Sequence, residues 1–515
     1  MKVIINRCIL LGSHMITIGR PTIQKNKVTS KIVVDNNEHE CFFEIEVKYE
    51  GGRDWVKKMK PSEDCDPFLI SLLPGAIKHH HDIVCEGDVS EDLLFNIRNI
   101  FIPAVVKYDR TLSEINVVAK SKIAAKSNRT QKMTGAGLSM GIDSLYVLEK
   151  YGNSEDSKID CSFVFDVGDF NVYRNHDKTE DYLLKKVEKL VNEIDLPLVY
   201  IKSNIASIFP GERGTRLTYY HIACVNLVKK FIGRYYSATT YTIQDLDLVN
   251  NSKGGEYAEM FLATVFSTKE VSIFPLPVEA SRIEKTIELA DYEIAQKYLH
   301  VCMREPFNCG LCKKCRRTLT TLDLIGKLDN FSDVFNIDYY KKNRSSYFEW
   351  LQLNAQNNDY YCKDILQLAE KKKCKYLKDK VGIQVAIKDL FQERHSINNK
   401  AEYTQNQKKW KKNSKQALKK LSDSLAEGKY RSVMVYGDNY STDMVNRLLE
   451  DMGIKIHSAI STTSDLISLM NQNDSEFDAV VVCNSTSYSI GIVKEIMFTY
   501  DKPVIYLDDC LRKTN

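Results

Sequence analysis

Short apolar segments alternate with amphipathic ones through the middle of this 515-residue chain. Apolar runs of strand length that alternate with helical patterns are typical of a parallel sheet covered by helices. The expected strands are Ile159–Asp166, Pro197–Ile201 and Tyr235–Thr240, and the expected helices are Ser144–Lys150, Asp181–Ile194, Tyr219–Phe231 and Ser281–Tyr298. This alternation constrains the fold more than any other feature, and it predicts an α/β domain with a parallel sheet over residues 129–328.

Residues 1–128 show a different pattern, in which apolar and polar residues alternate in short runs. Such runs favour half-buried strands, and the region is predicted to be a β-rich α+β domain. The expected strands are Cys41–Tyr49, His81–Cys85 and Ile102–Val106, and the expected helices are Asp66–Leu73 and Ser90–Ile97. His79, His80 and His81 precede one of these strands, and a solvated loop is favoured over a metal site because consecutive side chains point in different directions.

Two further regions complete the predicted organisation. Residues 329–428 have a helical pattern and are rich in lysine between 371 and 420. This segment fits a solvated helical surface, or a binding site for RNA or another acidic partner. Residues 429–515 again alternate strands with helices and predict a small flavodoxin-like or Rossmann-like domain. Its expected strands are Ser432–Tyr436, Lys455–Ile460, Asp478–Cys483 and Pro503–Leu507.

The composition is that of an ordinary globular protein, with 43% hydrophobic residues and a net formal charge of +4. That charge is too small to indicate nucleic-acid binding on its own. No run of eighteen apolar residues suggests a membrane-spanning helix, and no secretory leader is recognisable at the N-terminus. We therefore expect a cytoplasmic protein without a membrane partner.

The segment Gly135–Ser144 reads GAGLSMGIDS and has the character of a phosphate-binding loop. It lies between an expected strand and an expected helix, so its amides and the helix N-terminus can point at one anion. Gly141 permits close approach of the backbone, and Ser139 and Ser144 supply hydroxyl donors. Asp143 can cap the helix or help to hold magnesium. The segment lacks the GxxxxGK[ST] pattern of a Walker A loop.

Four of the fourteen cysteines fall close together with the spacing C-x6-C-x2-C-x2-C. They are Cys302, Cys309, Cys312 and Cys315. Two Cys-x-x-Cys steps can surround one ion tetrahedrally, and four protein ligands leave no position open for catalysis. The spacing predicts a structural zinc site, with an iron–sulfur cluster as the alternative.

The loop and the cysteines together resemble the motifs of the 7-cyano-7-deazaguanine synthases, the QueC family of PP-loop ATP pyrophosphatases. The segment Ser139-Met140-Gly141-Ile142-Asp143-Ser144 is similar to the family's SGGxDS, with Met140 in place of the first glycine of the pair. Phe165 and Asp166 stand where the family carries a phrase that faces the adenine of ATP. The resemblance covers about residues 129–325 and leaves the flanking regions outside it.

The resemblance implies an adenine nucleotide alpha-hydrolase-like fold and an ATP-dependent ligase that forms AMP and pyrophosphate. ATP, magnesium and zinc are the implied cofactors. The implied nucleotide-binding residues are Ser139, Met140, Gly141, Ile142, Asp143, Ser144, Phe165 and Asp166, and the implied catalytic residues are Asp143, Ser144, Arg282 and Lys285. The substrate would be a small-molecule acid, an amide or a nucleobase such as a deazaguanine, whose adenylate is attacked by a nitrogen nucleophile. Enlarged relatives in bacterial antiphage defence add a partner protein as an implied acceptor.

Other functions remain open on the sequence. A PP-loop sulfurtransferase would need a reactive thiol, for which Cys224 or Cys161 is the candidate. A sugar amidotransferase would use the same loop with another acceptor. A catalytically weak nucleotide-binding scaffold is the third alternative, because Met140 departs from the family pattern.

Overall fold

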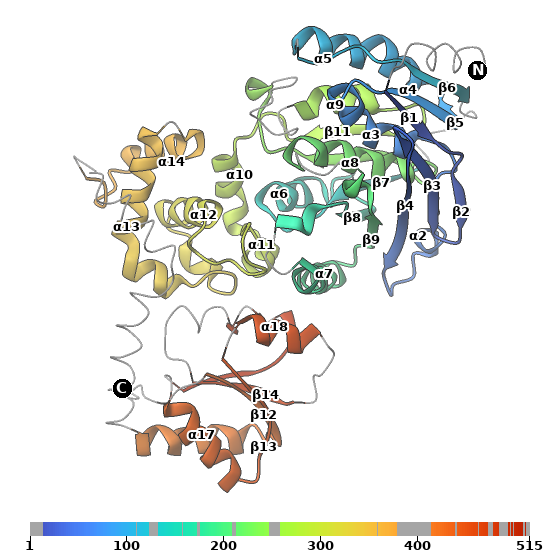
Figure 1. Cartoon of the computed structure of the whole chain (residues 1–515). Helices are drawn as coiled ribbons and strands as arrows, with labels where there is room; N and C mark the ends of the chain where they lie inside the picture. Colours follow the sequence, from blue (N-terminus) through green and yellow to red (C-terminus); the bar gives the residue numbers. More distant parts are fainter. Residues whose placement is uncertain are drawn as a thin grey trace. The chain divides into compact units, whose positions relative to one another are not determined.

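The computed structural model (Figure 1) forms two compact units. One unit comprises Met1–Asn171 and Leu190–Lys285, and the other comprises Val172–Lys189 and Thr286–Asn515. The structure describes residues 14–109, 111–122, 132–156, 158–172, 176–208, 213–246, 258–357, 359–378, 414–437, 440–461, 463–471, 477–483, 493–494, 496–497, 499–507 and 510.

The first unit is built on an eleven-stranded sheet with helices packed against it. The strands are β1 (Met15–Ile18), β2 (Thr22–Gln24), β3 (Lys27–Val34), β4 (Asn37–Lys48), β5 (Asp82–Ser90), β6 (Val117–Lys122), β7 (Met133–Gly137), β8 (Cys161–Asp166), β9 (Leu198–Ser203), β10 (Ile232–Ala238) and β11 (Ser272–Leu276). The helices are α2 (Asp54–Lys57), α3 (Asp66–Lys78), α4 (Glu91–Asn96), α5 (Ile102–Tyr108), α6 (Ile142–Tyr151), α8 (Arg213–Leu227), α9 (Glu259–Phe266) and the start of α10 (Arg282–Glu288).

Five neighbouring strands pair parallel throughout, in the order β11-β10-β7-β8-β9. The chain therefore builds outward from β7 in one direction through β8 and β9, and then returns to the other side of β7 with β10 and β11. The order reverses between β7 and β10. In open α/β sheets such a reversal leaves a crevice at the carboxyl ends of the two strands, because the connecting helices lie on opposite faces. The α/β architecture predicted for this region is confirmed.

The remaining strands extend the same sheet. β4 pairs antiparallel with β9, and the order then runs through β3 and β1 to β5 and β6. One apolar core continues from Ile16 to Ile273 and includes residues of α3, α8 and α9. Residues of both predicted regions thus share one sheet and one core. A boundary at residue 128 stays a prediction.

The predicted strand Ile102–Val106 is wrong. These residues begin α5, which directly follows a π-helical turn at Ile97–Phe101. The β-branched residues favoured a strand, but Pro103 suits the first turn of a helix, where its missing amide needs no partner. Ile102 and Val105 then meet the core from one helical face. The predicted helix Ser281–Tyr298 is also interrupted, by a 3-10 turn at Leu289–Asp291.

The second unit contains helices followed by a small parallel sheet. The helices are the first part of α7 (His176–Glu193), α11 (Glu293–Tyr298), α12 (Lys313–Leu324), α13 (Ile337–Gln356), α14 (Tyr360–Lys371), α17 (Tyr440–Asp451) and α18 (Thr463–Asn471). The strands are β12 (Ser432–Tyr436), β13 (Lys455–Ile460), β14 (Ala479–Val482) and β15 (Val504–Tyr506), in the order β13-β12-β14-β15 and all parallel. The four strands predicted near the C-terminus are confirmed.

The lysine-rich region is described only in part. α13 and α14 confirm its helical pattern, and residues 414–427 form another helix whose Ala417, Leu421 and Leu425 enter the core of the small sheet. Residues 379–413, which include most of the predicted partner-binding segment, lie outside the described residues. Within the described parts of the chain, no helix is both long enough and apolar enough to cross a bilayer.

Candidate active site and metal centre

The loop after β7 lies at the point where the strand order of the parallel sheet reverses. β7 ends at Gly137, the chain turns through residues 138–141, and α6 begins at Ile142. The amide of Leu138 donates to the carbonyl of Phe163 in β8 at 2.8 Å, which fixes the start of the turn. A Cβ at Gly137 would lie 2.8 Å from the Tyr235 hydroxyl in β10, so a larger residue there would force the Tyr235 side chain to shift.

The two predicted serines of the loop contact each other. The Ser139 amide donates to Ser144 Oγ at 3.2 Å, and the two hydroxyl oxygens are also 3.2 Å apart. Ser144 Oγ donates to the carbonyl of Gly141, whose own amide points at Ser139 Oγ at 3.4 Å. The loop amides named here are therefore held by the loop's own hydroxyls. Such weak internal contacts can be exchanged for an anion, because each hydroxyl can rotate to donate outward.

Gly141 is the N-cap of α6, and this described helix start has no side-chain cap. The first-turn amides have no intrahelical partner, and the positive end of the helix dipole lies at this end of α6, where the two serines also lie. This combination suits a phosphate group.

Met140 adopts a left-handed backbone conformation, with φ of 57°. Non-glycine residues avoid this region because their Cβ approaches the backbone, so the position favours glycine. This is the position at which the resembling family carries its first glycine. The Met140 side chain is 1% exposed, and its burial offsets the cost of the backbone strain. The chain therefore keeps the loop conformation without that glycine.

Asp143 does not cap α6 but pairs with two cations. Its Oδ2 lies 2.6 Å from Arg282 Nη2, and its Oδ1 lies 3.3 Å from Lys285 Nζ. Thr240, just after β10, donates its hydroxyl to Oδ2 at 3.3 Å. The sequence analysis named Asp143, Arg282 and Lys285 as candidates, and the structure brings Asp143 to the two cations, which lie 139 and 142 positions later. The sequence analysis missed Thr240, which no motif marks.

Helix α10 presents its two cations from one face, three positions apart. Its start is fixed by Ser281 and Glu284, because the Ser281 amide and hydroxyl both donate to Glu284 Oε2 at 2.8 Å. Lys285 is fully buried and donates to the carbonyl of Thr239 at 2.7 Å. Burial lowers the pKa of Lys285 below its usual value, although Asp143 opposes this effect.

The predicted adenine-contact residues lie at the end of β8, beside the loop strand. Phe165 is buried, and its ring lies 5.2 Å from the ring of His221 in α8. His221 Nε2 lies 2.8 Å from Asp169 Oδ1. Asp166 is half-buried at the strand end. No sequence motif marks His221, because 52 residues separate it from Asp169.

The two cysteines considered for sulfur transfer are fully buried. Burial raises the pKa of the Cys224 thiol well above its usual value, and it does the same for Cys161. A sulfur-transferring cysteine needs the opposite, because the thiolate is the nucleophile. Neither thiol has the setting that the sulfurtransferase alternative requires.

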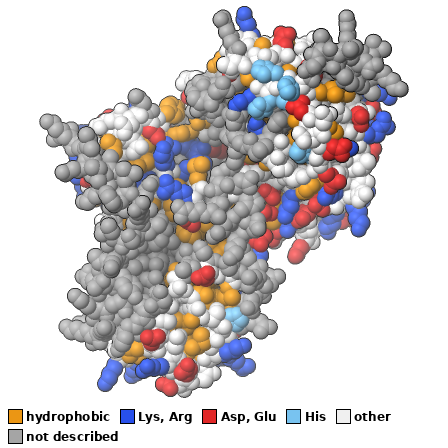
Figure 2. Space-filling view, in the orientation of Figure 1, with side chains coloured by type: hydrophobic (Ala, Val, Ile, Leu, Met, Phe, Trp, Pro, Cys, Tyr) orange, Lys and Arg blue, Asp and Glu red, His pale blue; other side chains and the backbone are white. Residues whose placement is uncertain are grey.

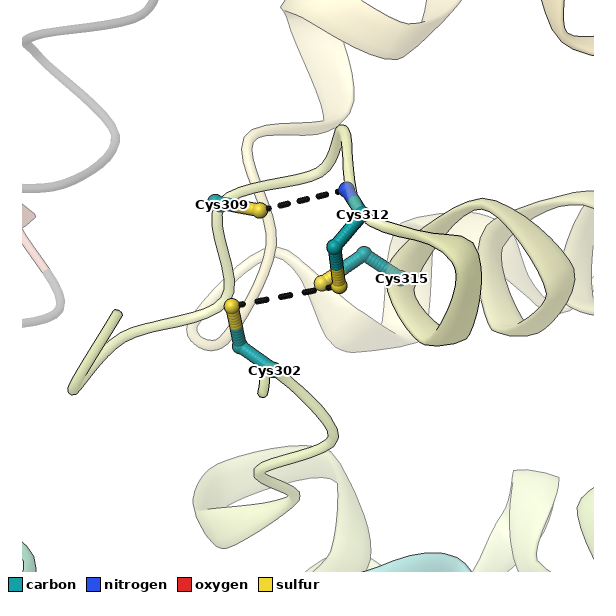
Figure 3. Close-up of side chains that lie close together, drawn as sticks. All are labelled: Cys302, Cys309, Cys312 and Cys315. Atoms are coloured by element: carbon teal, nitrogen blue, oxygen red, sulfur yellow. Dashed lines mark hydrogen bonds between the residues drawn. The ribbon is translucent and has the colours of Figure 1, made fainter. Parts of the chain in front are cut away.

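The four clustered cysteines converge in the second unit (Figure 3). All four sulfur atoms lie within 4.8 Å of one another, and the sulfurs of Cys302 and Cys312 are 3.9 Å apart. Tetrahedral zinc with Zn–S bonds of about 2.3 Å requires sulfur separations of about 3.8 Å. The group is therefore positioned to hold one zinc ion. A multi-iron cluster would hold its ligands further apart, so the geometry favours a single ion.

Backbone amides surround the sulfurs and favour their ionised form. The amides of Leu311 and Cys312 donate to Cys309 Sγ at 3.4 and 3.3 Å, and the amide of Glu305 donates to Cys302 Sγ at 3.4 Å. Gly310 has φ of 71°, which permits the tight turn between two ligands. Burial, together with the neighbouring cysteine sulfurs, raises the pKa of the Cys315 thiol well above its usual value, so a thiolate there depends on a bound cation.

The turn that carries Cys309 and Cys312 is held in place by residues of α12 and α13. Tyr347 of α13 donates its hydroxyl to the carbonyl of Gly310 at 2.8 Å. Arg316 of α12 is buried and donates to the carbonyl of Leu311 at 2.9 Å. Its guanidinium lies between the rings of Tyr347 and Trp350, 5.4 and 5.3 Å from their centroids. Loss of the metal would therefore disturb the packing of α12 on α13.

Comparisons of the chain with family models, with curated proteins and with solved structures found no match. The function is therefore argued from the site alone.

Proposed function

We propose that this protein is a PP-loop ATP-dependent ligase that adenylates a carboxylate or amide oxygen and releases pyrophosphate. The observation that carries the proposal is the cluster at the strand reversal, where an uncapped helix start, two serine hydroxyls and two cations adjoin one loop. Every one of these groups is a donor suited to a phosphate chain. Within this proposal the parallel strands form an adenine nucleotide alpha-hydrolase-like core, and the small C-terminal sheet forms a flavodoxin-like domain.

The loop after β7 and helix α10 both bind the triphosphate, each through different groups. Ser139 and Ser144 turn their hydroxyls from each other toward the phosphates, and the first-turn amides of α6 add further donors. Arg282 exchanges its partner Asp143 for a phosphate oxygen, since its side chain is 22% exposed and has room to move. Lys285 stays on the carbonyl of Thr239 and stabilises the charge that develops on the leaving pyrophosphate.

Magnesium fits this site only after such an exchange. Hard oxygen ligands suit magnesium, and Asp143 supplies a carboxylate, but both of its oxygens face cations in this structure. Release of Arg282 leaves Asp143 Oδ2 for the ion, which would supply charge neutralisation for the departing pyrophosphate. Zinc belongs to the separate four-cysteine site, where it has no open position and serves the fold.

The chemical sequence has two displacements. A substrate oxygen attacks the α-phosphorus of ATP, the bond to the β-phosphate oxygen breaks, and pyrophosphate leaves. A nitrogen nucleophile then attacks the activated carbon and displaces AMP. The chain contributes mainly positioning and charge, as is general for phosphate chemistry. His221, held by Asp169, is a candidate to take the proton of the nitrogen nucleophile.

The first test is nucleotide binding and product analysis with the full chain. We expect Mg-ATP to bind, and Ser144→Ala and Arg282→Ala to weaken binding at least tenfold in calorimetric titration. Ser424→Ala is the matched control, because Ser424 is exposed and lies in the other unit. With a pool of candidate acids and ammonium, phosphorus NMR should show AMP and pyrophosphate in equal amounts.

Two outcomes would contradict the proposal. Formation of ADP and orthophosphate would mean attack at the γ-phosphate rather than the α-phosphate. Tight ATP binding without any AMP formed across carboxylate, amide, nucleobase and sugar acceptors would favour the scaffold alternative instead. Mass spectrometry of co-purified proteins after incubation with ATP tests a protein acceptor, including one used in antiviral defence.

A further inference from the structure

A second group of metal-ligating side chains lies in the first unit, at the edge where three neighbouring strands begin or turn. His14 precedes β1, Asp35 follows β3, and His81 precedes β5. These strands are adjacent in the order β3-β1-β5. The register aligns Ile16 of β1 with Val34 of β3, and Met15 of β1 with Asp82 of β5. Histidine side chains gather on one part of the surface in view in Figure 2.

The backbone of each of the three residues is fixed by hydrogen bonds. The carbonyl of His14 accepts from the Asp82 amide at 2.9 Å. The Asp35 amide donates to the carbonyl of Met15 at 3.2 Å, and the His81 amide donates to the carbonyl of Ala76 at 2.9 Å. The three side chains therefore start from positions that the sheet and the end of α3 determine.

Two tight turns bring the Asp35 and His81 side chains toward each other. Asp35 and Asn36 form the two-residue hairpin turn between β3 and β4, with φ of 45° and 71°. Both positive values belong to the type I′ turn that fits the twist of a hairpin. His80 has φ of 59°, and this left-handed residue reverses the chain after α3. The reversal separates His81 from His79 and His80, so only the third of these consecutive histidines joins the group.

The ligand atoms are already close to the spacing that an ion requires. Asp35 Oδ2 lies 3.1 Å from His14 Nδ1 and 2.8 Å from His81 Nε2. The three ligand atoms all lie within 4.8 Å of one another. Zinc bonds to nitrogen and oxygen of about 2.0–2.2 Å give ligand separations of about 3.3–3.5 Å in a tetrahedron. Both carboxylate–imidazole distances are shorter than this, so the side chains must move apart by less than about 1 Å at each of these two contacts to admit an ion.

The carboxylate is oriented by a partner outside the group. Asp35 Oδ1 accepts from the Met15 amide at 3.2 Å, which leaves Oδ2 for the two imidazoles. Such outer contacts orient metal ligands and are a regular part of protein metal sites. The His14 side chain is 68% exposed and that of His81 is 8% exposed, so the group has one buried wall and an open path to solvent.

We propose that His14, Asp35 and His81 form a binding site for a divalent late first-row transition metal ion, with zinc as the reference ion. Two imidazole nitrogens and one carboxylate oxygen are the ligand types that zinc, cobalt and nickel accept. On binding, the ion replaces the protons that link the two rings to the carboxylate. Three protein ligands leave at least one coordination position for water or an external ligand, in contrast to the closed four-cysteine site.

The test counts zinc ions in the untagged full-length chain. Protein is dialysed against micromolar free zinc at neutral pH, and the bound zinc is measured by mass spectrometry. We expect one more ion per chain in the wild type than in His81→Ala or Asp35→Asn. We also expect each variant to weaken the affinity of this ion by more than about 100-fold. Because the result is a difference, it does not depend on whether the four cysteines are loaded.

His80→Asn is the matched control, because it changes a neighbouring histidine and asparagine tolerates the left-handed conformation. This variant should bind as many ions as the wild type. Asp35→Asn guards against misfolding, since asparagine also suits the turn while its neutral amide is a poor metal ligand. Equal zinc counts in the wild type and in both site variants would overturn the proposal. A loss of the ion in His80→Asn as well would assign it to a nonspecific histidine surface and would equally overturn the site.

Discussion

Replacement of Asp143 by asparagine tests the electrostatics of the candidate active site without a change in side-chain size. The variant removes the carboxylate that lies 3.3 Å from the fully buried Lys285 amine. Breaking a buried ion pair costs about 3–5 kcal/mol. Since Asp143 is 15% exposed and Arg282 can turn to solvent, we expect a cost at or below the lower end of that range, about 2–3 kcal/mol. At about 2–4 °C per kcal/mol, the melting temperature should fall by about 4–12 °C at pH 7.

The loss should shrink as the pH rises. Burial already lowers the pKa of Lys285, and removal of Asp143 takes away the main group that opposes this effect. Between the folded pKa and the unfolded value of about 10.4, the unfolded chain binds more protons, so stability rises with pH. The variant should therefore recover part of its stability between pH 7 and pH 9.5, measured relative to the wild type by thermal unfolding.

The control and the second variant make this test decisive. Asp156→Asn changes an exposed aspartate of the same unit and should leave the melting temperature unchanged. The double variant Asp143→Asn/Lys285→Met removes both charges and should be more stable than Asp143→Asn alone. A single variant as stable as the wild type at every pH would refute the buried-pair interpretation.

Three further outcomes follow from the described contacts. Cys312→Ser should lower the zinc content by one ion per chain and lower the melting temperature, whereas Cys374→Ser, outside the cluster, should leave both unchanged; metal analysis with calorimetry measures this. Met140→Gly should relieve about 1 kcal/mol of backbone strain but lose about 2–3 kcal/mol from side-chain burial. The free energy of unfolding, measured with denaturant, should therefore fall by about 1–2 kcal/mol, and a stabilised variant would contradict this. Lys229→Met should cost at least about 3 kcal/mol in the same assay, because it leaves the fully buried Asp66 without the amine that neutralises it; an unchanged midpoint would contradict this.

Local patterns predicted local structure well. The cysteine cluster could be predicted because its four cysteines lie within one short segment. Their spacing restricts the ways in which they can converge on an ion. The strands of the parallel sheet were recognised because burial on both faces produces continuous apolar runs. The strand prediction for Ile102–Val106 was wrong because a short apolar run occurs in buried helices as well as in buried strands.

Contacts between distant segments were only partly accessible. The resemblance implied that Asp143, Arg282 and Lys285 share one site, but no local pattern predicts their contacts, because these depend on β10 lying beside β7. The pairing of β4 with β9 and the approach of His14 to His81 likewise depend on strand order. The pattern of apolar residues in a strand does not reveal which strand will lie beside it. These contacts can therefore be identified only from the complete sheet.

The antiparallel pairing of β4 with β9 has a consequence for synthesis of the chain. Phe42 in β4 hydrogen-bonds to Asn204, which lies 162 positions later. While the ribosome makes the intervening segment, one side of β4 exposes unpaired backbone groups and apolar residues such as Phe43 and Ile45. Exposed strand edges of this kind recruit other chains and aggregate. Expression of residues 1–128 alone would make that hazard permanent, so production of this protein should begin from the full-length chain and benefit from chaperones that shield nascent strands.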